Sequence, residues 1–297
     1  MQRGEREKLE PSTLAAYDQH VRLHIVPLCG DRKLSQLTRP IVEGYRDRLV
    51  ENLSRPMASR VLRSFTAIVA EAQRRGHVAQ NVAQGVRVSR AKRERGKVTI
   101  PSKDDLRALL SGAMASSEPM AQPLVMVAVF AGLRASELRG LAWKAIDLKA
   151  ATLTVSQRAD LKGTIGAPKS ASGRRAIPLP PTMVSTLREW KLRCRKSNDD
   201  LVFPSIAGRV MTHRYMSANI LGAVLEAAKL SGAGYTLHDL RHAAASLWIE
   251  QRVSPKRVQG WMGHSSIQVT YDTYGHLFDQ AEQDAAVASA IERELIP

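Results

Sequence analysis

A strongly basic run divides the sequence into two parts. Residues 87–97, RVSRAKRERGK, carry six basic side chains against one acidic residue, Glu94. The run has no apolar periodicity, which is typical of a linker. The sequence on both sides has apolar residues at helical spacing, so each side must bury a core of its own. The predicted divisions are a helical domain at 1–86, a linker at 87–100, a second domain at 101–278 and a C-terminal helix at 279–297.

The first domain is predicted to be a small all-helical bundle. Apolar residues recur at helical spacing in three stretches, and Gly76 is a natural C-cap for the third of them. A short segment at 78–86 closes the domain. The three predicted helices span residues 11–26, 40–52 and 55–76.

The second domain is predicted to be α+β. Ser102, followed three residues later by Asp105, starts a helix as a capping box. Residues 119–132 are apolar almost all round, which is typical of a buried core helix. Residues 148–180 have strand character interrupted by glycines, so they predict a small antiparallel sheet. Further helices are predicted at 135–143, 181–195 and 212–230.

The stretch from Tyr235 to His276 holds the densest set of candidate site residues. Thr236 and Asp239 form a capping box, so a helix begins there. Arg241 lies three positions after His238, which places both on one face in the first turn. A helix N-terminus offers free N–H groups and partial positive charge, so an anion is favoured at this position.

A second helix in this stretch begins at Ser254-Pro255 and ends at Gly263, directly before His264. A third short helix carries Tyr271 and Tyr274 towards a Gly-His turn. Each residue also has an ordinary structural interpretation: His264 as a helix cap and Tyr274 as a core aromatic. Tyr271 competes with Tyr274 for any functional role.

The net charge points to an anionic partner. The formal charge is +16, which is typical of proteins that bind nucleic acid or an anionic membrane. The longest apolar run, Pro123 to Gly132, is about half the length that spans a bilayer, and the charged N-terminus has no signal-peptide core. The two cysteines, Cys29 and Cys194, are most simply reduced thiols.

Nothing in the sequence supports a metal or nucleotide cofactor, because it has no glycine-rich phosphate loop, HExxH motif or carboxylate cluster. The basic residues are candidates for contacts to a nucleic-acid backbone, with a solvated surface as the alternative. The proposed DNA contacts are Arg87, Arg90, Lys92, Arg93, Arg95 and Lys97 in the linker, and Arg60 and Arg63 in the third helix.

Two further residues are candidates with weaker support. Arg134 follows the apolar helix, where an arginine needs an anion, and Glu137 offers a structural ion pair as the alternative. Lys169 lies in the predicted sheet region. A lysine on a mobile hairpin can act as a general acid, although surface lysines there are common.

The order of these motifs closely resembles the tyrosine recombinase (phage integrase) family. The resemblance rests on Arg134 in GLRASEL, a lysine before GRRAIPL, the HDLRH motif, a following Gly-His, and Tyr274 in TYGHL. It covers residues 10–280, and five short motifs in the right order are specific together. It implies a helical core-binding domain and an α+β catalytic domain that form a C-shaped clamp around DNA.

The resemblance also implies a role for each motif residue. Arg134 and Arg241 hold the scissile phosphate, and His264 donates a hydrogen bond to it. Tyr274 is the nucleophile that forms a 3′-phosphotyrosine link. Lys169 protonates the leaving 5′-oxygen, and His238 is a general base or hydrogen-bonding partner. The family's chemistry needs no metal or other cofactor.

Several points depart from the family or stay open. Tyr274 lies ten residues after His264, where several relatives use nine, and Tyr271 fits worse. Lys162 is an alternative to Lys169. Many integrases carry an arm-site-binding domain upstream, and the sequence starts too late to include one. This leaves either an enzyme without that domain or a shortened chain.

The resemblance implies integration or excision of mobile DNA by a homo-tetramer on two double-stranded DNA sites. The C-terminal helix would dock on a neighbouring subunit, and accessory DNA-bending proteins could take part. A cytoplasmic, nucleoid-associated protein without a membrane partner is expected. Two alternatives are a type IB topoisomerase-like nicking-closing enzyme and a non-catalytic DNA-binding relative. Only about 85 residues precede the linker, too few for a topoisomerase's N-terminal clamp, and the full motif set argues against a decayed site.

Overall fold

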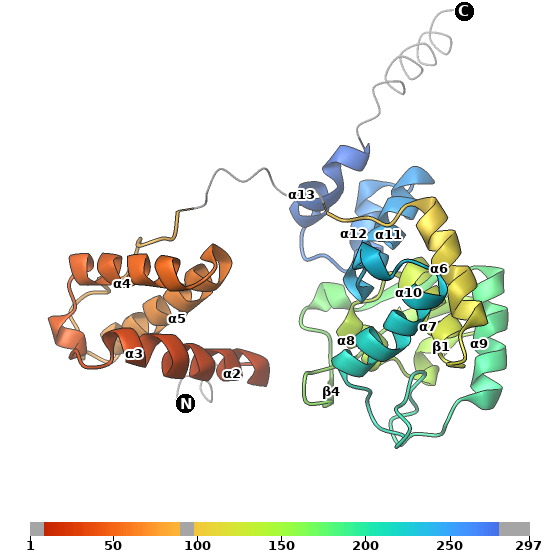
Figure 1. The fold of residues 1–297 in the computed structure, drawn as a ribbon, viewed down its shortest axis with the longest axis horizontal. Helices are drawn as coiled ribbons and strands as arrows, with labels where there is room; N and C mark the ends of the chain where they lie inside the picture. The colour runs from red at the N-terminus through yellow and green to blue at the C-terminus, as the bar shows by residue number, and fades with distance from the viewer. Residues whose placement is uncertain (1–8, 90–97, 279–297) are drawn as a thin grey trace, which may run out of the picture. The chain divides into compact units, whose positions relative to one another are not determined.

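The chain divides into two units in the computed structural model, Met1–Gly96 and Lys97–Pro297 (Figure 1). The structure describes residues 9–89 and 98–278. Five predicted DNA contacts (Arg90, Lys92, Arg93, Arg95 and Lys97) and the predicted C-terminal helix at 279–297 lie outside the described residues. The proposed domain boundaries therefore stay predictions.

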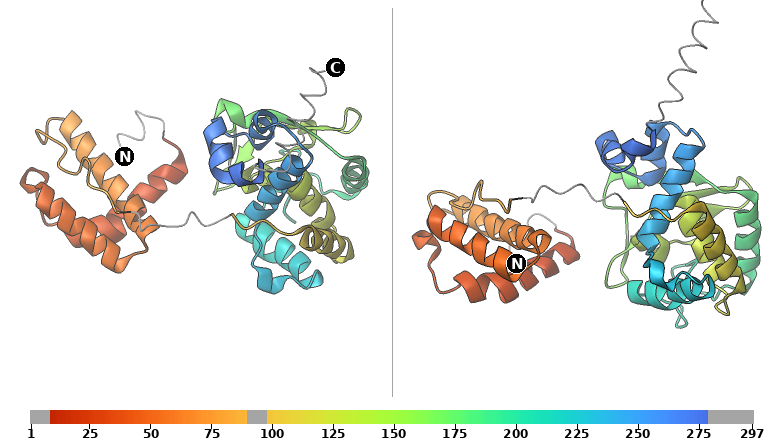
Figure 2. Two further views of the ribbon diagram at one scale, coloured as in Figure 1. Left: turned by 90° about the horizontal axis from the view of Figure 1, so that it is seen from above. Right: turned by 45° about the horizontal axis from the view of Figure 1, so that its top comes forward.

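The first unit is helical (Figure 2). Its helices pack round one apolar core. Tyr45 and Phe65 lie at its centre, with ring centroids 5.0 Å apart. The predicted helix at 11–26 continues to Cys29 through a π-helical turn next to Pro27, which has no N–H to donate. The elements are α2 (Pro11–His20), η1 (Val21–Ile25), α3 (Val26–Cys29), η2 (Leu34–Gln36), α4 (Arg39–Asn52) and α5 (Arg55–Arg74).

The helices of the second unit surround α7, which is buried on nearly every side because its sequence is apolar all round. It packs against α6, α9 and α11. The longer helices are α6 (Lys103–Ala115), α7 (Ala121–Ala131), α9 (Pro181–Arg193), α11 (Leu237–Glu250), α12 (Pro255–Met262) and α13 (Ile267–Phe278). The shorter helical pieces are α8 (Ala135–Arg139), η3 (Trp143–Ala145), η4 (Ala171–Gly173), η5 (Tyr215–Leu221), α10 (Gly222–Ala227) and η6 (Ser231–Ala233).

In the second unit, two further helix ends differ from the prediction. The helix predicted at 135–143 stops at Arg139, because Gly140 lies against the backbone of Arg158 and Ala159. A Cβ at Gly140 would come within 2.7 Å of that backbone. The helix α13 runs on to Phe278 through Gly275 and His276, where a turn was expected.

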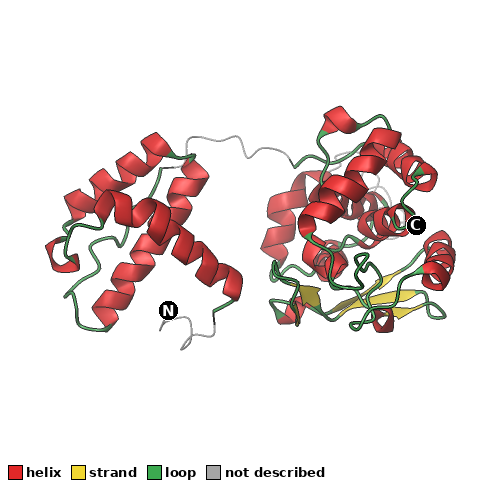
Figure 3. Cartoon of the chain, turned by 60° about the horizontal axis from the view of Figure 1, so that its bottom comes forward, coloured by secondary structure: helices red, strands yellow, loops and turns green. Residues whose placement is uncertain are grey.

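The strands of the second unit form two small antiparallel sheets along one side of it (Figure 3). The first has the order β1-β2-β5, with Leu153 of β2 paired to both Ile146 and Ile177. The second is the β3-β4 hairpin, which buried Arg139 holds by donating to the carbonyl of Asp160. The strands are β1 (Ile146–Asp147), β2 (Thr152–Val155), β3 (Arg158–Ala159), β4 (Ile165–Gly166) and β5 (Arg175–Pro178).

The predicted fold class, mostly α with a small antiparallel sheet in the second domain, is confirmed. Across residues 9–89 and 98–278, no helix combines the length and the apolar character needed to cross a membrane. In the same residues, no three or more His, Cys, Asp or Glu side chains gather as a metal ion would require.

Candidate active site

The helix α11 begins as the sequence predicts and turns Arg241 into the protein. The Thr236 hydroxyl accepts hydrogen bonds from the N–H groups of His238 and Asp239, and the Asp239 carboxylate accepts from the Thr236 N–H. Arg241 is 2% exposed and donates to the carbonyl oxygens of Gly132 and Met262. Burial lowers the pKa of Arg241 to about 9, and the neighbouring Arg134 adds to this effect. Arg241 therefore keeps its charge at neutral pH.

Arg134 lies near Arg241, although the two are 107 positions apart in the sequence. Its Nη2 donates to the carbonyl oxygen of Gly263 at 2.8 Å, and Arg241 donates to the carbonyl of the preceding residue, Met262. Its Nη1 also pairs with Glu137 at 2.8 Å, which is the structural ion pair that the sequence left open. The side chain of Arg134 is 39% exposed, so part of it faces solvent.

Two left-handed glycines expose the carbonyl oxygens that hold these arginines. Gly132 ends α7 with φ 58°, and Gly263 ends α12 with φ 62°. The last carbonyls of a helix lack partners within the helix and carry partial negative charge. Guanidinium groups satisfy them, so two helix C-termini position both arginines.

Arg175 is a third arginine of the cluster, and the sequence reasoning did not select it. It donates to both carboxylate oxygens of Glu137, at 3.0 and 2.8 Å, and to the carbonyl of Trp261 at 2.6 Å. Burial alone would raise the pKa of Glu137, but Arg175 and Arg134 outweigh it and lower the pKa to about 2. Strand alternation offered a signal, because Arg175 shares the buried face of β5 with Ile177.

His264 follows Gly263 and is held by Thr270, a fully buried residue of α13. Its Nδ1 lies 2.9 Å from the Thr270 Oγ1. Burial and the nearby charge of Arg241 lower the pKa of His264 to about 4, so the imidazole is neutral at neutral pH. With Nδ1 engaged by Thr270, Nε2 remains for another partner.

Tyr274 is fully buried, whereas Tyr271 is 46% exposed. The Tyr274 phenol oxygen lies 2.6 Å from Nδ1 of His242, a residue that the sequence reasoning did not select. The Tyr274 and His264 rings are nearly parallel, at 11°, with centroids 6.4 Å apart. Burial raises the pKa of Tyr274, and the charge of Arg241 partly offsets this. The phenol is therefore protonated in the DNA-free protein.

His238 lies at the exposed end of the same group. Its ring packs edge-on against His242, with centroids 4.4 Å apart. Burial is the main cause that lowers the pKa of His238, and the charge of Arg241 lowers it further. The sequence contained a signal for His242, since it lies four residues after His238 in HDLRH and so shares its helix face.

Lys169 is the predicted catalytic residue that the structure leaves apart. It is exposed between β4 and η4, and no described hydrogen bond or ion pair joins it to the other five candidates. The segment that follows it does reach the cluster, because the Gly173 carbonyl accepts from Arg175 at 3.0 Å. Lys162, the alternative, is exposed in the β3-β4 turn.

The assembled group combines three guanidinium groups, one carboxylate, neutral imidazoles and a phenol. The positive charge exceeds the negative charge, and burial makes an uncompensated cation costly. An anion with several oxygens, such as a phosphodiester, suits this arrangement because guanidinium donors match its geometry.

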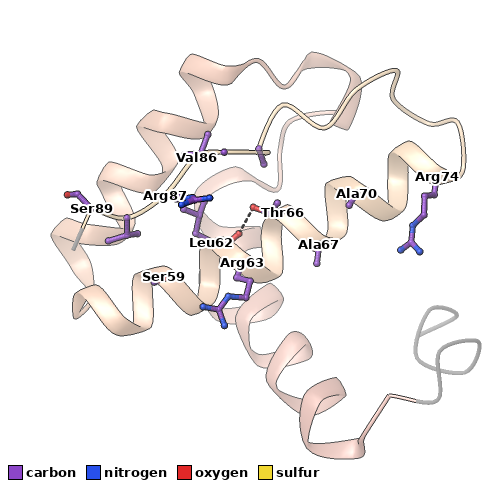
Figure 4. Close-up of a pocket in the computed structure, with 13 residues that line it drawn as sticks. Ser59, Leu62, Arg63, Thr66, Ala67, Ala70, Arg74, Val86, Arg87 and Ser89 are labelled. Carbon is purple, nitrogen blue, oxygen red and sulfur yellow. Dashed lines mark hydrogen bonds between the residues drawn. The ribbon is translucent and has the colours of Figure 1, made fainter. Parts of the chain in front are cut away.

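Two of the predicted DNA contacts line a groove in the first unit. Arg63 of α5 and Arg87 border a space of about 1000 Å³ between α5 and residues 83–89 (Figure 4). Arg60 does not line this groove. It lies near His20 of α2, whose pKa is lowered mainly by burial and further by the charges of His24 and Arg60.

A model of the phage integrase family matches residues 99–281. The chain belongs to this family. Membership confirms the predicted class, a tyrosine-type site-specific DNA recombinase of the integrase kind.

Relatives extend the similarity to most of the chain. The prophage integrase IntR of Escherichia coli K12 is 24% identical over 312 residues, which cover 93% of this chain and 74% of that protein. A XerC-like tyrosine recombinase of Caldanaerobacter subterraneus is 24% identical over 306 residues, with 93% and 77% covered.

Solved structures share the fold. The integrase of transposon Tn1549, bound to transposon right-end DNA, superposes with a TM-score of 0.80 at 20% identity, covering 98% of this chain and 96% of that one. A lambda integrase dimer bound to a COC′ core site gives a TM-score of 0.66 at 21% identity, with 88% and 90% covered.

Proposed function

We propose that this recombinase cuts one DNA strand by attack of Tyr274 on a phosphodiester held by Arg134 and Arg241. The observation that carries the proposal is the convergence of these residues from three distant segments. The two arginines donate to consecutive carbonyls, those of Gly263 and Met262, directly before His264. The phenol of Tyr274 lies close enough to Arg241 for the arginine's charge to affect its pKa.

The arginines would stabilise the charge that develops on the phosphate oxygens in the transition state. Fixed donors in a water-poor site do this without reorganising during the reaction. Arg175, which is paired with Glu137, would add positive charge to the cluster. His264 would donate a hydrogen bond from Nε2 while Thr270 occupies Nδ1. His238, at the exposed end of the group, would hydrogen-bond to the phosphate.

Attack by Tyr274 would leave a 3′-phosphotyrosine link and a 5′-hydroxyl, with Lys169 as the general acid for the leaving oxygen. Because Lys169 is exposed and its segment meets the cluster at Gly173, this role requires the loop after β4 to close over the bound DNA. A 5′-hydroxyl from a second strand would reverse the reaction and complete strand exchange.

Both units would contact the DNA, with the linker across its backbone and Arg63 and Arg87 on phosphates. The lambda integrase relative forms a tetramer on a Holliday junction, which supports the same assembly here, with the C-terminal helix docked on a neighbour. Accessory DNA-bending proteins and association with the nucleoid belong to the same proposal.

The nucleophile is tested with a nicked suicide substrate that traps the covalent intermediate. Tyr274→Phe should abolish the covalent protein–DNA adduct and leave DNA binding nearly unchanged. Tyr271→Phe, on the same helix, is the matched control and should form the adduct normally. Adduct that persists without the Tyr274 hydroxyl and disappears without that of Tyr271 would move the nucleophile.

The groove is tested through salt dependence. The double variant Arg63→Gln, Arg87→Gln should bind DNA more weakly, with a salt slope smaller by about two phosphate contacts. Arg32→Gln, an exposed change outside the groove, is the control. An unchanged slope in the double variant would remove the groove from the DNA contacts.

A further inference from the structure

The hydroxyl of Tyr274 points at a base that no sequence motif had assigned. His242 Nδ1 and the phenol oxygen are 2.6 Å apart, on the neighbouring helices α11 and α13. We propose that His242 is the proton acceptor for Tyr274 in DNA cleavage, a role that rests on the proposed function. His238, the other candidate, has no described hydrogen bond to the phenol and packs against His242 instead.

The tautomer of His242 follows from this contact. The phenol of Tyr274 is protonated, because burial raises its pKa, so its O–H is the donor. Nδ1 of His242 must then carry a lone pair, and a neutral imidazole keeps its proton on Nε2. The basic nitrogen is therefore already aligned on the proton that Tyr274 must lose.

The surroundings keep His242 neutral until DNA arrives. Burial and the neighbouring His238 lower the pKa of His242 to about 4. A phosphodiester among the arginines would add negative charge nearby and strengthen the affinity of His242 for a proton. The titratable and charged groups that face His242 are His238, Asp239 and Arg241 on α11, His264 before α13, and Tyr274 on α13.

The step balances in atoms and charge. The Tyr274 oxygen forms a bond to phosphorus while its proton passes to Nδ1 of His242, giving an imidazolium. The bond from phosphorus to the 5′-oxygen breaks, and that oxygen takes a proton from the general acid, Lys169 in the proposed function. When a 5′-hydroxyl attacks in the rejoining step, its proton returns to Lys169 and His242 returns its proton to the phenol.

The variant His242→Asn distinguishes the ability of residue 242 to take a proton from its ability to hold the phenol by a hydrogen bond. Its side-chain oxygen can accept the phenol's hydrogen bond near the place of Nδ1, but it cannot take the proton at neutral pH. His242→Ala removes both properties, and His242→Gln is a second non-basic variant should the first fail to fold. Retained DNA affinity and tryptophan fluorescence identify the folded variants.

The measurement is the single-turnover rate of adduct formation on the suicide substrate, from about pH 6 to about pH 9. The wild-type rate should show no titration of His242 there, because a pKa of about 4 keeps its imidazole neutral over the whole range. The His242→Asn rate should be lower by about 10²- to 10⁴-fold at neutral pH and should rise about tenfold per pH unit, because the phenol must ionise first.

A second readout uses a fluorinated tyrosine placed at position 274, whose phenol ionises more readily. It should restore the His242→Asn rate by a larger factor than it changes the wild-type rate. A uniform loss at every pH, or faster adduct formation in His242→Ala, would overturn the inference, since His242 would then only hold the tyrosine. Failure of the wild-type protein to form an adduct would instead defeat the proposed function.

Discussion

Replacing Glu137 by Gln should destabilise the second unit by roughly 3 kcal/mol at neutral pH. The pKa of Glu137 falls from 4.5 to about 2 on folding, and each pKa unit corresponds to about 1.36 kcal/mol. Because Glu137 is 3% exposed, solvent does not screen this interaction appreciably. Removing one member of a buried ion pair typically costs about 3–5 kcal/mol, which agrees with this figure.

The effect of Glu137→Gln should also depend on pH, in a known direction. The folded pKa lies below the unfolded one, so the carboxylate contributes its full stability above about pH 4.5. That contribution is lost as the pH falls towards about 2, so the difference between wild type and variant should shrink in this window.

Tryptophan fluorescence during urea unfolding reports this difference for one unit only. All four tryptophans, Trp143, Trp190, Trp248 and Trp261, lie in the second unit. Glu189→Gln, an exposed change on α9, should alter stability by less than about 0.5 kcal/mol. A loss below about 1 kcal/mol for Glu137→Gln at pH 7, or a loss that does not change with pH, would refute the reasoning.

Three further changes test how the site is held. Gly132→Ala should lower stability by about 1–3 kcal/mol in the same urea assay, because φ is 58° there and a Cβ would lie 2.9 Å from that of Ala244. Thr270→Val should slow adduct formation about tenfold or more without weakening DNA binding, because His264 loses its Nδ1 partner, and Thr270→Ser should restore the rate. Ser102→Ala should cost about 1 kcal/mol in urea unfolding by removing the N-cap of α6.

The parts of the fold that the sequence predicted well are those set by local chemistry. The capping box of Thr236 and Asp239 starts α11 at the predicted place, and Gly263 ends α12 in the left-handed conformation that favours glycine. The apolar run at 119–132 became the buried helix α7 because no face of it is polar.

Other features depended on contacts that no local pattern contains. The early end of α8 comes from the close approach of Gly140 to β3, which is a tertiary contact. Glu137 pairs with both Arg134 and Arg175. The pair with Arg134 could be inferred from their three-residue spacing, whereas Arg175 lies 38 positions away. His242 was visible in principle by its four-residue spacing from His238, but its phenol partner lies 32 positions away on another helix.

The three arginines of the cluster differ in exposure, so only one side of the cluster is open to solvent. The side chains of Arg175 and Arg241 are covered, and backbone carbonyls and Glu137 already hold them in the DNA-free protein. Of the three, only the Arg134 side chain is substantially exposed, at 39%, so in the proposed function a phosphate would approach from its side. In the proposed function the covered arginines need no ordering when DNA arrives, so their charge would be preorganised for the transition state, where fixed donors contribute most to the rate.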